Sequence, residues 1–95
     1  MANKFKVRVR DTEHLVFEGD VERISSFNEL GPFDIYPMHA NFISILRQVV
    51  TLYNNNEVVK ELKFEQAVMK VKKDVASIFL GIEVLFVEDE IVANK

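Results

Sequence analysis

Residues able to do chemistry are few in this sequence, and their spacing does not assemble a site. Cysteine is absent, and the two histidines, His14 and His39, lack the short His/Asp/Glu spacings of a metal site. The three glycines are isolated from one another, so no glycine-rich loop is available to cradle a phosphate. We therefore expect neither a metal ion nor another cofactor.

Nucleophile patterns lead to the same expectation. No Gly-x-Ser-x-Gly elbow occurs, and no base neighbours the serines at 25, 26 and 44. Acid pairs such as Glu29 with Asp34, and the run at 88–90, are typical of solvated loop charges. We expect no catalytic residue, although an enzyme whose site is assembled across loops stays open as an alternative.

Composition indicates one soluble domain. Hydrophobic residues make up 48% of the 95, eight of them Phe, which is ample for a single packed core. The net charge of −3 argues against a nucleic-acid partner, whose binding proteins are normally basic. The longest apolar run, 75–87, is interrupted by Ser77, Gly81 and Glu83 and is too short for a transmembrane helix. The N-terminus has no signal-peptide core.

A basic face marks the first expected strand. Phe5, Val7 and Val9 alternate with lysine and arginine, so one side of residues 5–10 is apolar and the other cationic. Such a face either contacts a phosphate or an acidic partner, or is simply solvated and protects a sheet edge. The second arrangement is the commoner one.

The remaining chain alternates with a period of two and contains no helical period. Further strands are expected at 14–18, 21–27 with a bulge near Arg23, 33–36, 48–53, 57–64, 67–72, 75–80 and 82–86. Turns are expected at 19–20, 54–56 and 73–74. About 8–10 short strands with closely spaced turns are typical of an all-β, two-sheet antiparallel β-sandwich.

Residues 31–46 form the most distinctive stretch. Gly31-Pro32 is a turn signal, and Pro37 stops the following strand because it has no N–H to donate. Residues 38–41 indicate a sharp corner, after which an apolar run starts a new buried segment.

This stretch resembles the signature of the ε subunit of F-type ATP synthases, called δ in mitochondria. The matching residues are Gly31, Phe33, Ile35, Tyr36, Pro37, His39, Ala40, Ser44 and Leu46. Upstream, residues 17–24 are similar to the family's Phe-x-Gly-x-Val-x-x-Ile element at the expected spacing. The resemblance covers about residues 4 to 87.

The resemblance implies a non-catalytic rotor subunit of the central stalk. Such a subunit links the γ subunit to the c ring, coupling proton transport to ATP synthesis. It implies γ and the c ring as partners, and no nucleic acid, membrane insertion or small-molecule ligand. The implied location is peripheral, on the cytoplasmic face of the bacterial inner membrane or its organellar equivalent. A free-standing β-sandwich adaptor unrelated to the synthase stays open as the alternative.

The resemblance also implies two contact sets. The γ-facing set is Tyr36, His39, Phe42, Ser44, Glu65 and Gln66, and the set facing the c ring is Asn28, Glu29, Leu30, Gly31 and Pro32. A corner histidine alternatively holds its own loop by hydrogen-bonding a backbone carbonyl. Glu29 is the carboxylate expected to pair with basic groups on the c-ring loops.

Three departures from the family pattern affect this region. Met38 replaces a usual Gly, Asn41 a usual Pro, and Gln66-Ala67 a pair of glycines. We expect the backbone at Met38 to avoid positive φ or to be strained. At residues 65–67 a partner would meet side chains in place of glycine backbone.

The domain boundaries follow from the same pattern. Residues 1–88 are expected to form the sandwich, and 89–95 a short acidic tail. Members of the family usually continue into a helical hairpin that inhibits ATP hydrolysis and in some cases binds ATP. We expect this chain to couple without inhibiting hydrolysis or sensing ATP.

Overall fold

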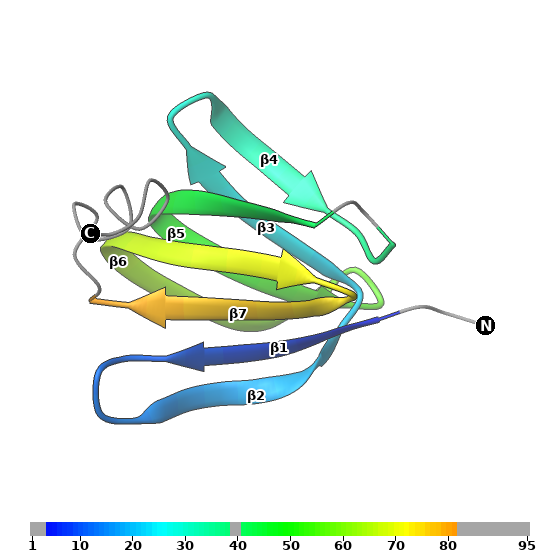
Figure 1. Cartoon of the computed structure of the whole chain (residues 1–95). Coiled ribbons are helices and arrows are strands. Elements are labelled where there is room, and N and C mark those ends of the chain that lie inside the picture. The colour runs from blue at the N-terminus through cyan, green and yellow to red at the C-terminus, as the bar shows by residue number, and fades with distance from the viewer. Residues whose placement is uncertain (1–3, 39–40, 82–95) are drawn as a thin grey trace.

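The computed structural model describes residues 4–38 and 41–81, and these fold into one hydrogen-bonded sheet (Figure 1). Its strands are β1 (Phe5–Arg10), β2 (Leu15–Val21), β3 (Arg23–Asn28), β4 (Gly31–Ile35), β5 (Phe42–Asn54), β6 (Glu57–Lys72) and β7 (Val75–Leu80). Their order is β2-β1-β7-β6-β5-β3-β4, and every pairing is antiparallel except that of β1 with β7. The predicted all-β class is confirmed.

The sheet folds over on itself because its two longest strands bend. The ladder between β5 and β6 slips at Arg47/Gln48, which leaves Glu65 as the extra residue of a bulge on β6. Gln48 has φ of 77° at this point. One layer contains β2, β1, β7 and the adjoining halves of β6 and β5, and the other contains the remaining halves with β3 and β4.

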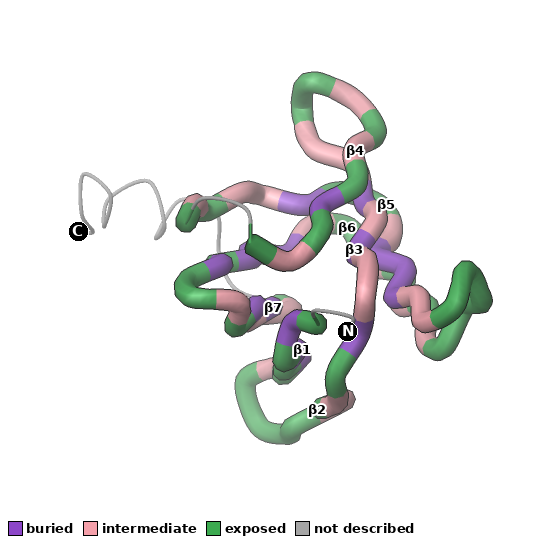
Figure 2. The backbone as a smooth tube through the Cα atoms, turned by 90° about the vertical axis from the view of Figure 1, so that its right-hand side faces the viewer, coloured by how far each residue is buried: buried purple, intermediate pink, exposed green. Residues whose placement is uncertain are grey.

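The core lies between these layers and draws on all seven strands (Figure 2). Phe5, Val7 and Val9 are fully buried while the cations between them are exposed, so the alternation predicted for β1 is confirmed. Ala67, Met69 and Val71 of β6 are buried too. Alternating burial therefore fixes which face of each strand is left to solvent.

The turn predicted at Gly19-Asp20 is wrong. Both residues lie within β2, where they pair with Val7 and Lys6 of β1. A Cβ added to Gly19 would come within 3.1 Å of Cζ of Phe17, so the glycine makes room for an aromatic ring within the strand. The chain turns at Glu22, whose N–H donates to the carbonyl of Tyr53 at 2.9 Å.

Several strand boundaries also differ from the predictions. Arg23 begins β3, so the break at residue 22 replaces the bulge expected near Arg23. The apolar run from Phe42 belongs to β5, and the strands predicted at 57–64 and 67–72 are one strand continuing through the bulge. The described residues hold seven strands in place of 8–10, and the strand predicted at 82–86 lies outside them. In the part of the chain that the structure describes, no helix could cross a bilayer.

Candidate partner interface

The corner between β4 and β5 is fastened to the turn between β6 and β7 by two side-chain hydrogen bonds. The Met38 N–H donates to Oδ1 of Asp74 at 2.7 Å, and the Lys73 N–H donates to Oδ1 of Asn41 at 3.0 Å. Each segment thus caps a backbone group of the other. The carbonyl of Asp74 also accepts the N–H of Lys6 at 2.9 Å, which ties the β6–β7 turn to β1.

Met38 adopts φ of 74°, a conformation that favours glycine. The expectation that this residue would avoid positive φ is therefore wrong, and its stated alternative, a strained backbone, is what the geometry supports. The fastening by Asp74 stabilises this conformation. Asn41, at the other departure, supplies an acceptor that proline lacks. Neither Asp74 nor its link to the corner was indicated by the sequence, where residues 73–74 signalled only a tight turn.

Exposed side chains gather at this corner end. Tyr36 is 50% exposed and Met38 is 74% exposed, and both precede the start of β5. Phe42, by contrast, pairs with the buried Val71 and packs against the core. His39 lies outside the described residues. The corner therefore offers Tyr36 and Met38 to a partner, with Phe42 supporting them from within.

The opposite end of β4 carries the second candidate contact region. Glu29 and Leu30 form the tight turn between β3 and β4, and the Leu30 N–H donates to Oδ1 of Asn28 at 2.9 Å. Leu30 is 91% exposed, the highest value among the large apolar side chains described. Gly31 has φ of 116°, a conformation that favours glycine. Pro32 is tolerated because β4 is the last strand of the sheet.

Three residues of the predicted γ-facing set lie toward this second end. Arg47 pairs with both Phe27 and Gln66, so Gln66 shares a row with the β3–β4 hairpin, and Glu65 is its neighbour at the bulge. Nδ2 of Asn28 donates to Oγ of Ser44 at 3.4 Å, a long hydrogen bond. The structure therefore divides the predicted γ-facing residues between two ends of the molecule.

Paired strands join these two ends rigidly. Every residue of β4 pairs with β3, which in turn pairs with the bent half of β5. On the outer face of this layer Arg23 stacks over the ring of Tyr53 at 3.8 Å from its centroid, and its Nη1 lies 3.8 Å from Oδ2 of Asp34.

Hydrogen bonds in the turn between β1 and β2 affect the pKa of Asp11. Backbone N–H groups of Glu13 and His14 donate to Oδ1 of Asp11 at 2.8 and 2.7 Å, and these bonds hold the pKa of Asp11 below its ordinary value. Among residues 4–38 and 41–81, no group of three His, Cys, Asp or Glu side chains is placed to hold a metal ion.

Comparison with known proteins identifies the family of this domain. The fold is a two-layer β-sandwich, and residues 4–81 match the family model of the ATP synthase delta/epsilon chain β-sandwich domain. The chain belongs to that family.

Solved structures share its fold. A chain in the central stalk and c-ring structure of the Tetrahymena thermophila mitochondrial ATP synthase matches with a TM-score of 0.68 at 14% identity, over 83% of this chain and 64% of that one. A chain of the Euglena gracilis mitochondrial ATP synthase matches with a TM-score of 0.72 at 10% identity, over 81% of this chain and 50% of that one. This chain thus spans about half to two thirds of their lengths. No curated protein sequence matches it.

Proposed function

We propose that this chain is a non-catalytic rotor subunit of an F-type ATP synthase that links the γ subunit to the c ring. Membership of the delta/epsilon family supports a place in the stalk, and two structural neighbours come from ATP synthases. A linking part needs two contact surfaces that do not overlap. The observation that carries the proposal is the placement of exposed Leu30 and exposed Met38 beyond opposite ends of β4.

The corner end is assigned to γ and the β3–β4 turn to the c ring. The corner presents Tyr36, a residue type enriched at interface cores, and its backbone is held by Asp74. The turn presents apolar Leu30 beside Glu29, which can pair with basic groups on the partner. In this arrangement Glu65 and Gln66 contact the c ring, or the part of γ that lies nearest to it. Ring rotation is transmitted to γ through the paired strands, and the location is peripheral to the coupling membrane.

Reconstitution tests the proposal. A synthase stripped of its own delta/epsilon subunit is supplied with this chain, and ATP-driven proton pumping is compared with ATP hydrolysis. We expect pumping to be restored by the wild-type chain and lost with Leu30→Asp, while the matched exposed change Val58→Asp is tolerated. No restoration by the wild-type chain, or equal effects of the two variants, would contradict the proposal. Tight binding to a protein outside the synthase would favour the free-standing adaptor.

A further inference from the structure

The basic face of β1 continues across the sheet, onto residues that are distant in sequence. Parallel pairing with β7 places Arg8 beside Ser77, and antiparallel pairing places Ser77 beside Lys70 of β6. One row along the sheet, Lys6, Val75 and Lys72 align in the same way. Two columns of cations therefore flank β7, one on β1 and one on β6.

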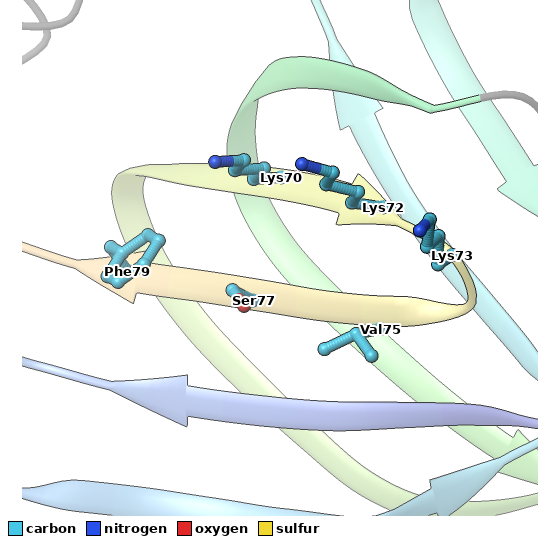
Figure 3. A pocket seen from close by; sticks show the side chains of 6 residues that line it. All are labelled: Lys70, Lys72, Lys73, Val75, Ser77 and Phe79. Atoms are coloured by element: carbon cyan, nitrogen blue, oxygen red, sulfur yellow. The ribbon is translucent and has the colours of Figure 1, made fainter.

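The floor between the columns is hollowed. A depression of about 430 Å³ is lined by Lys70, Lys72, Lys73, Val75, Ser77 and Phe79 (Figure 3). A second of about 220 Å³ is lined by Arg8, Arg10, Ser77 and Phe79. The two share Ser77 and Phe79, so they form one trough along β7. We name this surface the β7 trough.

The cations on the two sides of the trough are not neutralised to the same extent. On the β1 side, Nε of Arg8 lies 3.5 Å from Oε2 of Glu18, and Asp20 pairs in register with Lys6. On the β6 side, no ion pair to Lys70, Lys72 or Lys73 is found within residues 4–38 and 41–81. The nearby Asp74 carboxylate accepts the Met38 N–H. The β6 side of the trough therefore carries a net positive charge, although the overall charge of the chain is −3.

The spacing of these cations matches an extended acidic chain. Cations two residues apart on one strand are separated by about 6.6 Å, and the two columns are two strand spacings, about 9.5 Å, apart. An extended peptide places side chains on alternate sides with the same repeat of about 6.6 Å on each side. Consecutive carboxylates would therefore reach the β1 and β6 columns in turn, with the peptide backbone over Ser77.

From this match we propose that the β7 trough binds an extended acidic segment of a partner polypeptide. The trough lies on the outer face of the layer formed by β1, β7 and β6. Of its lining residues, Lys73 adjoins the corner assigned to γ, through its hydrogen bond to Asn41. The proposal does not rest on the stalk function. Its recognition chemistry is ionic, so it is expected to weaken with added salt.

Fluorescence anisotropy with a labelled peptide of six consecutive glutamates tests this, using the full 95-residue chain. We expect binding by the wild-type chain, no binding of the hexaglutamine analogue, and a loss of affinity as salt is raised from about 0.05 to 0.3 M. Lys70→Gln/Lys72→Gln should weaken binding roughly twofold to thirtyfold, since two exposed ionic contacts are lost. The control Arg47→Gln/Lys63→Gln removes the same charge from exposed residues away from the trough and should have little effect.

Equal weakening by both double variants would overturn the proposal, because binding would then follow net charge alone. Inorganic triphosphate and vesicles containing anionic phospholipid serve as competitors. Stronger binding of either than of the peptide would assign the trough to a phosphate group or a membrane surface and overturn the acidic-segment proposal. Amide shift changes confined to β1, β7 and the paired half of β6 would support it, and changes confined to other strands would refute it.

Discussion

Oδ1 of Asp74 accepts the N–H of Met38 at 2.7 Å, joining two residues that lie 36 positions apart in the sequence. The bond runs from the β6–β7 turn to the corner that follows β4. With the bond from Lys73 to Asn41, it makes the geometry of the corner depend on the opposite turn. The corner residues proposed to contact γ are thus held by the layer that contains β1, β6 and β7.

Removing the Asp74 acceptor should loosen the corner. Asp74 has φ of 63°, which glycine and asparagine both tolerate, so Asp74→Gly removes the carboxylate without adding backbone strain. We expect Asp74→Gly to lower the free energy of unfolding by about 1 kcal/mol or more. Urea denaturation measures this, and amide hydrogen exchange should show lost protection at Met38.

Asp74→Asn is the matched control, because it keeps an Oδ1 acceptor at the same place. Its stability should lie closer to that of the wild type than to that of Asp74→Gly. Full protection of the Met38 amide in Asp74→Gly would show that the bond does not hold the corner.

Relieving the backbone strain at Met38 should stabilise the protein. A side chain at φ of 74° is disfavoured relative to glycine, so Met38→Gly is expected to raise the free energy of unfolding by up to about 1 kcal/mol. Val58→Gly, at another exposed apolar residue but within a strand, should instead destabilise by about 0.5–1 kcal/mol. A Met38→Gly variant as unstable as Val58→Gly would argue against the strain.

Adding a methyl group at Gly19 should destabilise the protein, because the group would press against the ring of Phe17. The added Cβ would lie 3.1 Å from Cζ of Phe17, a tight contact that the ring must relieve by moving. We expect Gly19→Ala to cost about 1–2 kcal/mol in thermal or urea unfolding. In a Phe17→Leu background most of that cost should vanish, and an unchanged cost there would place its origin elsewhere.

The pKa of Asp11 gives a pH-dependent prediction. Because hydrogen bonds from Glu13 and His14 lower it in the folded state, the carboxylate stabilises the β1–β2 turn above the ordinary Asp pKa of 3.8. This stabilisation is lost as pH falls below 3.8 through the folded-state pKa. A carboxyl titration followed by NMR should place the Asp11 pKa below 3.8, and Asp11→Ala should remove this part of the acid sensitivity. A pKa at or above 3.8 would contradict the geometry.

The strands with one buried face were predictable because burial imposes a strict alternation. Phe5, Val7 and Val9 of β1 show it, and so do Ala76 and Ile78 of β7. The turns at 55–56 and 73–74 were also predictable, since Asn55, Asn56 and Asp74 adopt the left-handed conformation that Asn and Asp tolerate. The predicted end of a strand was wrong where a glycine serves another purpose than turning the chain. Gly19 signals a turn locally but serves as a space for Phe17 within β2.

The candidate sites were less predictable because they depend on which strands become neighbours. The sequence showed a basic face on β1, but only the pairing of β7 with both β1 and β6 brings Lys70 opposite Arg8. The division of the predicted γ-facing residues likewise follows from the bulge at Glu65, which places Gln66 in the row of Phe27. Long-range pairing of this kind leaves no local signal.

Binding to the γ subunit of the same organism tests the central claim most directly. The tagged chain, its Tyr36→Ala variant and its Leu30→Asp variant are compared for quantitative capture of purified γ. We predict that the wild-type chain captures γ, that Tyr36→Ala captures less, and that Leu30→Asp captures as much as the wild type. Failure of the wild-type chain to bind γ, or loss of binding in Leu30→Asp with retention in Tyr36→Ala, would contradict the account.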